Sequence, residues 1–175
     1  MTSKYKILCL VLNLFTLNYY KWVILGTVFN GIPILSGNVC DARLIRNYVN
    51  RGGNPHIYLY DNFAKPMPNS YSFLACAVQN DDKEIVSKLI DQGVSVNQKD
   101  QEGDIPLHFV KSIAMAKFLL DKGANINAQG EYRYSPLHLV KSPELAKYLI
   151  ERGADVNATD LGDTKPEWSK YFKAQ

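Results

Sequence analysis

The strongest constraint on this chain is one short sequence pattern that occurs three times at a fixed spacing. Each copy runs from an apolar segment to a glycine and then, four residues later, to an asparagine. The glycines are Gly93, Gly123 and Gly153, so both intervals are 30 residues. A period of this size is typical of proteins built from stacked structural repeats. We therefore expect a chain that works through an extended surface rather than through a catalytic pocket.

The residues before each of these glycines, and before Gly52, predict an amphipathic helix. Positions −8, −7, −4 and −3 relative to the glycine are apolar, which places them on one helical face. They are Leu44, Ile45, Tyr48 and Val49; Ile85, Val86, Leu89 and Ile90; Met115, Ala116, Leu119 and Leu120; Leu145, Ala146, Leu149 and Ile150. One such helix has no partner for its apolar face, so stacking of the four is needed to build a core. The glycine would close each helix with a left-handed residue.

A second, shorter helix is predicted in each unit. Ile105-Pro106-Leu107-His108 and Ser135-Pro136-Leu137-His138 place a proline at the first helical position, where a missing N–H costs nothing. Only short links separate these starts from the longer helices, so the short helices should be abbreviated. Ser142 followed by Pro143 is a typical start for a long helix. The turn-rich stretches 98–104, 128–134 and 158–163 should project as hairpin-like fingers.

The combined pattern resembles the ankyrin repeat, most closely at Ser135-Pro136-Leu137-His138 and Gly153-Ala154-Asp155-Val156-Asn157-Ala158. The resemblance covers roughly residues 40–166. It implies an all-α, ankyrin-repeat solenoid of helix-turn-helix units with hairpin-like fingers, preceded by a hydrophobic N-terminal segment. The shortened repeats look like those of ankyrin proteins from intracellular bacteria, a resemblance that would imply a host protein as the target.

Two units depart from the family pattern. Ile105 stands where the family usually has a threonine, so the hydroxyl contact to His108 should be lost. The second unit begins Ser72-Phe73-Leu74-Ala75 and lacks both the proline and the histidine. The insertion Ile57–Tyr71 should be the least regular part of the repeat body.

We divide the chain into three parts. They are a hydrophobic leader at 1–37, repeats at 38–163 (partial 38–71, then 72–104, 105–134 and 135–163), and a C-terminal capping half-repeat at 164–175. In the leader, Lys4 and Lys6 precede the apolar run Ile7–Phe15. This pattern fits a secretory signal, a membrane anchor within residues 7–35, or an apolar cap on the first repeat. It favours a membrane-associated or secreted location over a cytoplasmic one.

Charge and cysteine content argue against nucleic-acid binding, a disulfide framework and a zinc site. All 17 acidic side chains lie in residues 41–175, where 17 basic side chains balance them. A neutral body has no electrostatic footprint for nucleic acid. Cys9, Cys40 and Cys76 are odd in number and widely spaced, which predicts three free thiols and neither a disulfide framework nor a zinc site.

No catalytic or cofactor motif is present. The sequence contains no phosphate-binding glycine loop and no nucleophile elbow. His108 and His138 have no histidine four residues on, and we expect no carboxylate cluster beside them. We predict that they complete the starts of the short helices. The chain should therefore have no catalytic, cofactor-binding or metal site, and should not be an enzyme.

The predicted function is protein–protein interaction, as an adaptor or a competitive inhibitor acting as a monomer. The resemblance implies contacts through the finger tips and the concave helix face. Carried onto this chain, those residues are Gln101, Glu102, Lys111, Glu131, Tyr132, Arg133, Lys141 and Leu161. Tyr132 beside Arg133 is the strongest candidate, because both residue types are enriched in binding hot spots. Two alternatives stay open: a membrane-tethered structural scaffold, and an enzyme with a site in the 57–71 insertion.

Overall fold

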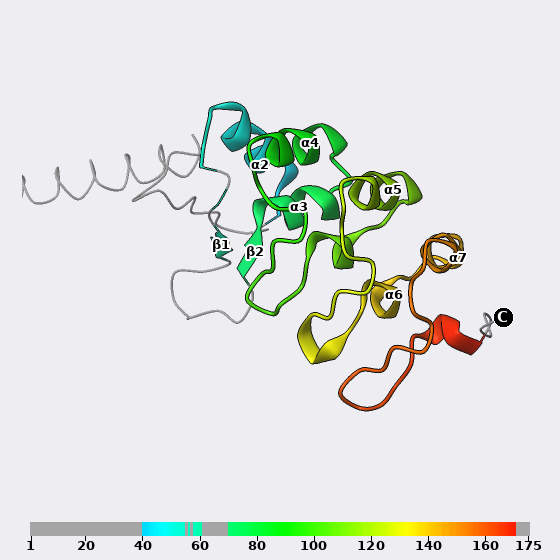
Figure 1. The fold of residues 1–175 in the computed structure, drawn as a ribbon. Coiled ribbons are helices and arrows are strands. Elements are labelled where there is room, and N and C mark those ends of the chain that lie inside the picture. Colours follow the sequence, from blue (N-terminus) through cyan, green and yellow to red (C-terminus); the bar gives the residue numbers. More distant parts are fainter. Residues whose placement is uncertain (1–39, 55, 57, 61–69, 171–175) are drawn as a thin grey trace, which may run out of the picture.

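The computed structural model describes residues 40–54, 56, 58–60 and 70–170. The predicted leader, most of the 57–71 insertion and the last five residues lie outside these ranges, as does Cys9. The described helices stack in sequence order from α2 at one end to α7 and the C-terminal turn at the other (Figure 1). The repeats form the helical solenoid that the repeat pattern predicts, and the described residues add one pair of short strands.

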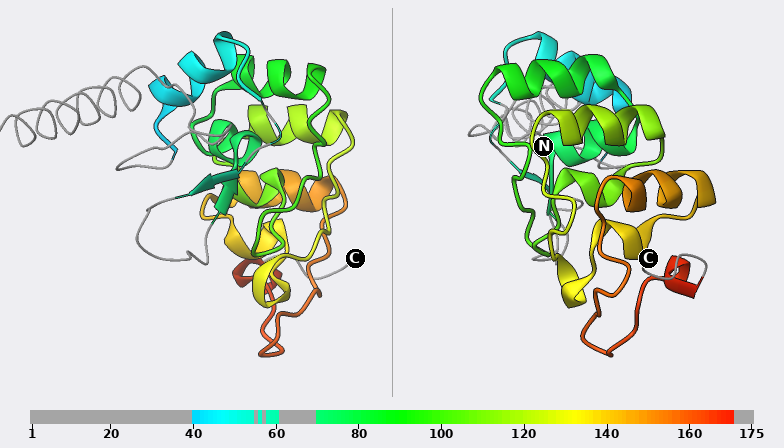
Figure 2. Two further views of the ribbon diagram at one scale, coloured as in Figure 1. Left: turned by 90° about the vertical axis from the view of Figure 1, so that its left-hand side faces the viewer. Right: turned by 45° about the vertical axis from the view of Figure 1, so that its right-hand side comes forward.

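Two rows of helices make up the stack. The long helices are α2 (Ala42–Asn50), α4 (Lys83–Asp91), α5 (Ile113–Asp121) and α7 (Pro143–Glu151). The short helices are α3 (Phe73–Gln79), the 3₁₀ turn η1 (Pro106–Phe109), α6 (Pro136–Leu139) and the 3₁₀ turn η3 (Glu167–Lys170). Along the short row, α3 contacts η1, η1 contacts α6, and α6 contacts η3. The turned views in Figure 2 show the loops between units projecting from one side of this stack.

The long helices bury the predicted apolar stripe. Ile85, Val86 and Leu89 of α4 are fully buried, and the equivalent positions of α5 and α7 are buried as well. The fourth position of the stripe, such as Ile90, is only partly buried against the core. Each helix begins at a side-chain cap that accepts main-chain N–H groups, namely Asp41, Asp82, Ser112 and Ser142.

Each long helix ends at a glycine in the left-handed region, as predicted. The φ angles of Gly52, Gly93, Gly123 and Gly153 are 78°, 90°, 89° and 98°. At the end of α4, Gly93 N donates to Ile90 O at 2.9 Å and Val94 N to Leu89 O at 3.1 Å. These bonds satisfy carbonyl groups that the helix itself leaves unpaired.

The short helices differ in length as the sequence predicts. Helix α3 has seven residues, whereas η1 and α6 have four each. Helix α3, which lacks the proline and histidine, begins instead at Ser72, whose Oγ accepts from Ala75 N at 3.0 Å. The second unit therefore uses a hydroxyl cap where the later units use a histidine.

Asparagine side chains join consecutive repeats. Asn97 Nδ2 donates to Gly123 O at 3.0 Å, and Asn97 Oδ1 accepts from Asn125 N at 2.8 Å. Asn127 makes the equivalent bonds to Gly153 O and Asp155 N, at 3.1 and 2.9 Å. The asparagine in the repeated pattern is thus a connection between units, placed by the glycine turn that precedes it.

The insertion after α2 is more regular than predicted at its two ends. Strand β1 (Tyr58–Tyr60) pairs antiparallel with β2 (Ser70–Ser72), with Leu59 opposite Tyr71. Main-chain pairing brings the ends of the insertion together, which periodicity analysis misses in strands of three residues. Its middle, 61–69, lies outside the described residues.

The prediction of three free thiols is wrong, because Cys40 and Cys76 form a disulfide. Their Cα atoms lie 4.9 Å apart although 36 positions separate them in sequence. Both residues are buried, Cys40 just before α2 and Cys76 inside α3. The number and spacing of the cysteines did not predict this bond, because only the packing of α2 on α3 brings the two side chains together.

The C-terminal segment packs on the last repeat. Trp168 Nε1 donates to Val140 O at 2.9 Å, and the indole lies against the core. The assignment of residues 164–175 as a capping half-repeat remains a prediction. Among the described residues, no helix combines the length and apolarity needed to span a membrane.

We predict that reducing the Cys40–Cys76 disulfide lowers the free energy of unfolding by about 3 kcal/mol, because the crosslink closes a long loop in the unfolded chain. Urea denaturation with and without reductant measures this difference. A Cys40→Ala/Cys76→Ala variant should show no such response to reductant. Peptide mapping without reduction should detect the two cysteine-containing peptides as one disulfide-linked species. Recovery of the two peptides only as separate species would contradict the bond.

Candidate functional site

Three finger loops project beyond the helix stack, at 98–104, 128–134 and 158–163; we call them the first, second and third fingers. An aspartate holds the tips of the first and third. Asp100 Oδ1 accepts from Glu102 N at 3.0 Å and from Asp104 N at 2.8 Å. Asp160 Oδ1 accepts from Gly162 N and Thr164 N, both at 2.8 Å. These bonds fix the direction in which each tip points.

The second finger has Gly130 at the position equivalent to Asp100 and Asp160, so it has no aspartate of its own there. The carboxylate that supports its backbone comes from the first finger. Asp104 Oδ1, on the first finger, accepts from Glu131 N at 3.3 Å. A Cβ atom at residue 130 would lie 1.5 Å from that oxygen and 2.7 Å from the Asp104 Cγ. The glycine therefore leaves the space through which the first finger supports the second.

The tip of the second finger has an unusual backbone. Tyr132 and Arg133 both have positive φ angles, 51° and 63°. In the first finger a glycine, Gly103, adopts the left-handed conformation. A non-glycine residue held there costs roughly 1 kcal/mol or more, and such strain tends to occur at functional sites.

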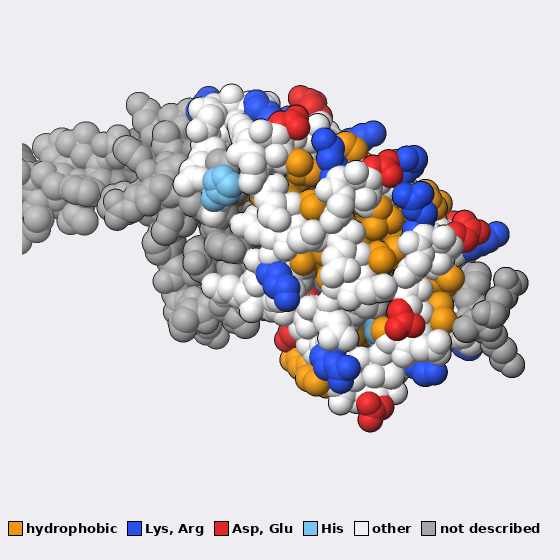
Figure 3. Space-filling view, viewed as in Figure 1, with side chains coloured by type: hydrophobic (Ala, Val, Ile, Leu, Met, Phe, Trp, Pro, Cys, Tyr) orange, Lys and Arg blue, Asp and Glu red, His pale blue; other side chains and the backbone are white. Residues whose placement is uncertain are grey.

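The second and third fingers form a joined apolar tip. Leu161 N donates to Tyr132 O at 2.9 Å. The side chains of Tyr132 and Leu161 are 57% and 66% exposed, the highest values among the large hydrophobic residues that the structure describes as exposed. The Tyr132 ring lies 6.0 Å from that of Tyr134, which lies 5.6 Å from the ring of His138. Figure 3 shows a small group of hydrophobic side chains at the lower left of the described residues, where the second finger lies in Figure 1, with a basic side chain beside it.

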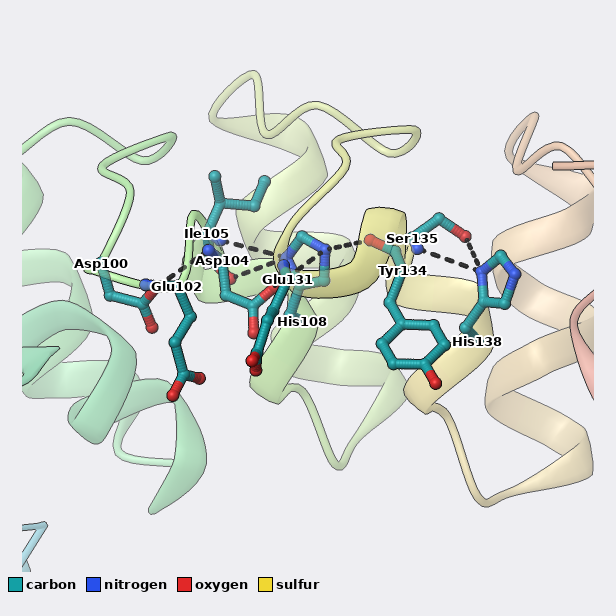
Figure 4. Close-up of polar contacts among 9 residues, drawn as sticks. All are labelled: Asp100, Glu102, Asp104, Ile105, His108, Glu131, Tyr134, Ser135 and His138. Carbon is teal, nitrogen blue, oxygen red and sulfur yellow. Dashed lines mark hydrogen bonds and ion pairs between the residues drawn. The ribbon is translucent and has the colours of Figure 1, made fainter. Parts of the chain in front are cut away.

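Four carboxyl groups lie beside this tip: Asp100, Glu102 and Asp104 of the first finger and Glu131 of the second (Figure 4). Burial, followed by the negative charges of Glu131, Asp100 and Asp104, raises the pKa of Glu102 to about 6. Burial also raises the pKa of Asp100 and of Asp104. The group therefore creates a negative potential across two fingers.

One oxygen from each of Asp100, Glu102 and Asp104 lies within 4.8 Å of the others, a spacing that a hard cation can use. However, Asp100 Oδ1 already holds two main-chain N–H groups, and Asp104 Oδ1 supports the second finger. We therefore assign Asp100 to forming the turn of the first finger and Asp104 to supporting the second finger.

The two histidines complete the starts of the short helices, as predicted. His108 Nδ1 accepts from Ile105 N at 3.1 Å, which assigns the proton to Nε2 and lets Nε2 donate to Tyr134 O at 3.1 Å. His138 Nδ1 accepts from Ser135 N at 3.0 Å and also contacts Ser135 Oγ at 2.8 Å. Ile105 offers no hydroxyl, so the predicted loss of that contact is confirmed.

The expectation that no carboxylate cluster accompanies the histidines is wrong for His108, because Asp104 belongs to the group with Asp100 and Glu102. Asp104 Oδ1 lies 3.6 Å from His108 Nε2. The finger folds back over η1 and brings Asp104 onto the ring, a contact set by the turn around Asp100. At His138, burial lowers the pKa of the imidazole, so the neutral ring is favoured.

The predicted partner-binding residues fall into two sets. Those at the finger tips lie together: Glu102 and Glu131 are half-buried in the acidic group, and Gln101, Tyr132, Arg133 and Leu161 are exposed. Lys111 and Lys141 are also exposed, but they lie in the links that lead into the caps of α5 and α7. No described contact joins these lysines to the tips.

Sequence reasoning missed the residues that position the tips, Asp100, Asp104 and Gly130. A signal for them exists, since Asp100 and Asp160 occupy equivalent positions in the 30-residue period and Gly130 falls midway between them. The repeat is recognised by its apolar and turn residues, and the exchange of aspartate for Gly130 at this polar position does not alter that pattern.

Comparison with known proteins agrees with this geometry. A family model for ankyrin repeats, three copies, matches residues 72–160, just over half of the chain. The chain therefore belongs to the ankyrin repeat family. No curated protein matches the sequence. Ankyrin repeats are generally protein–protein interaction modules, and the family is typically non-enzymatic.

We predict that Gly130→Ala lowers the free energy of unfolding by about 1–3 kcal/mol, because the new methyl group would displace the Asp104 carboxylate. Gly162→Ala is the matched control, since a Cβ there would come no closer than 3.4 Å to Asp160. Thermal or urea denaturation compares the two variants. Equal stability of the two would contradict the close approach of the first and second fingers.

We predict that Glu102→Gln stabilises the protein at pH 7.5 but not at pH 4. The pKa of Glu102 rises from its ordinary value of 4.5 to about 6 on folding, so ionisation costs the folded chain more than the unfolded one. The contribution of Glu102 to stability is thus fully present below pH 4.5 and is lost as the pH rises through 6. Because the side chain is partly solvated, the gain should be about 0.5 kcal/mol. Glu151→Gln, on the exposed face of α7, controls for the removal of one negative charge.

Proposed function

We propose that this chain is an adaptor or competitive inhibitor that binds a partner protein through the tips of the second and third fingers. The observation that carries the proposal is the joined pair Tyr132 and Leu161. Large apolar side chains on a soluble surface normally mark an interaction site when they lie together. Here a main-chain hydrogen bond from Leu161 N to Tyr132 O joins the two residues where the second and third fingers meet.

The composition of the tip supports this proposal. Tyr132 is followed by Arg133, and tyrosine and arginine are enriched among the residues that dominate binding energy. Hydrogen bonds within and between the fingers fix the backbone beneath both side chains. A surface ordered before binding loses little conformational entropy in the complex, so it can bind with little change of shape.

We propose that the remaining predicted residues border the same surface. Gln101 and Glu102 extend it onto the first finger, and Glu131 joins the first finger to the second. Lys111 and Lys141 would contact a partner only if it reached from the tips across the short-helix side of the stack. A partner that touches the tips alone would leave both lysines free.

The proposal treats the chain as a binding protein that acts without catalysis, cofactor or nucleic acid. The ring nitrogens of His108 and the Asp100 carboxylate are engaged in holding the backbone, which supports a structural role for them. The alternative enzyme site at 57–71 lies mostly outside the described residues. The alternative of a membrane-tethered scaffold depends on the leader, which also lies outside them.

The disulfide supports a location outside the reducing cytoplasm, because such bonds persist mainly in oxidising compartments. We propose that the chain reaches such a compartment, in line with the membrane-associated or secreted location that the leader favours. Mass analysis of the protein purified from its native source under thiol-blocking conditions tests this. Recovery of Cys40 and Cys76 as blocked thiols would contradict it.

A photo-crosslinking residue tests the binding surface directly. We predict that a benzophenone amino acid at position 132 or 161 forms one discrete adduct with a partner protein in the native source. The same residue in place of Lys147, on the exposed side of α7, should not form that adduct. An adduct that appears equally from all three positions, or from Lys147 alone, would contradict binding through the finger tips.

A further inference from the structure

We infer that the finger tips recognise a protein segment that presents a lysine or arginine beside an apolar side chain. This inference rests on the proposed function and specifies the chemistry of the partner. It follows from two features that meet at the second finger: the apolar pair Tyr132 and Leu161 of the second and third fingers, and the carboxyl groups of Asp100, Glu102 and Asp104 of the first finger with Glu131 of the second.

The apolar part of the surface is exposed and pre-formed. Tyr132 and Leu161 come from successive fingers whose backbones are 2.9 Å apart at Leu161 N and Tyr132 O. Tyr134 continues the aromatic surface from the tip toward α6, with its ring 6.0 Å from that of Tyr132. A partner side chain placed here would cover apolar area on two fingers at once. The favourable free energy of binding grows with the apolar area that is removed from water.

The acidic part adjoins the apolar part through Glu131. Glu131 directly precedes Tyr132 in the second finger, and hydrogen bonding with Glu131, followed by its charge, raises the pKa of Tyr132. Glu131 N also donates to Asp104 Oδ1 of the first finger at 3.3 Å, and the charge of Glu131 helps to raise the pKa of Glu102. The exposed ring and the acidic group therefore meet at the adjacent residues Glu131 and Tyr132.

The charge on this surface selects a cation. The groups that face Glu102 are Asp100 and Asp104 on its own finger and Glu131 on the next, and every one of these charges opposes its ionisation. His108 faces Asp104 from η1. A lysine or arginine from a partner would relieve this repulsion, and an arginine could also stack on the Tyr132 ring. An acidic group placed beside Glu102 and Glu131 would add to the repulsion and be rejected.

This arrangement also sets the direction of a pH effect. Glu102 loses its charge as the pH falls through about 6, and the attraction for a cation falls with it. Binding of a basic segment should therefore weaken between pH 7.5 and pH 5. A purely apolar partner would show no such change.

The test is a selection of random 12-residue peptides displayed on phage against the immobilised full-length chain. Recovered peptides are synthesised, and their dissociation constants are measured by fluorescence anisotropy at pH 7.5 and pH 5. Binding is compared with the Glu102→Gln/Glu131→Gln variant, with Tyr132→Ala, and with Glu144→Gln/Glu151→Gln. The last variant removes the same charge from α7 and serves as the matched control, and thermal melting confirms that each variant is folded.

We expect peptides with a lysine or arginine next to a leucine or aromatic residue. Their affinity should fall about tenfold or more in Glu102→Gln/Glu131→Gln and in Tyr132→Ala, and should not change in the α7 control. Their affinity should also fall at pH 5.

Two other outcomes separate the inference from the proposed function. Peptides without basic residues that depend on Tyr132 but not on the two glutamates would overturn the inference and leave binding at the finger tips standing. Failure to recover any peptide whose binding depends on Tyr132 would overturn both.

Discussion

Contact between neighbouring repeats is the interaction on which every other feature depends. A helix of nine residues is too short to be stable alone in water, so its stability comes from burial of its apolar face. Leu89, Leu119 and Leu149 occupy the same position in successive helices and are fully buried. The asparagines at 97 and 127 then bond each unit to the main chain of the next. Because the units share these contacts, the stack is a regular support for the loops between them.

The stack of repeats fixes the positions of the fingers. It thereby holds close together groups that an isolated loop would not keep together. Two non-glycine residues with positive φ occur at one tip, and four carboxyl groups gather beside it. Both features oppose folding locally. The repeats below stabilise the finger bases enough to tolerate them, which is the usual relation between a stable scaffold and a strained loop.

The parts of the fold that follow a local pattern were predictable. The apolar stripe, the glycine at each helix end and the short helices begun by proline all depend on residues within about one turn of each other. The prediction of free thiols failed because Cys40 and Cys76 meet only when α2 packs on α3. The carboxylate beside His108 was missed for a similar reason: Asp104 reaches the ring through a turn set by Asp100, and no helical or strand period describes that turn.

The sequence by itself determined the class of this protein, since a 30-residue period, its glycines and its buried stripe specify a stacked ankyrin solenoid. It also indicated that Tyr132 and its neighbours lie at a loop tip. Only the tertiary structure decided what that tip contains. The Asp104 carboxylate crosses to the second finger through the space at Gly130, and Leu161 joins Tyr132 from the third. These contacts link residues about 30 positions apart, and their geometry depends on the distance between stacked repeats, which local residue preferences do not specify.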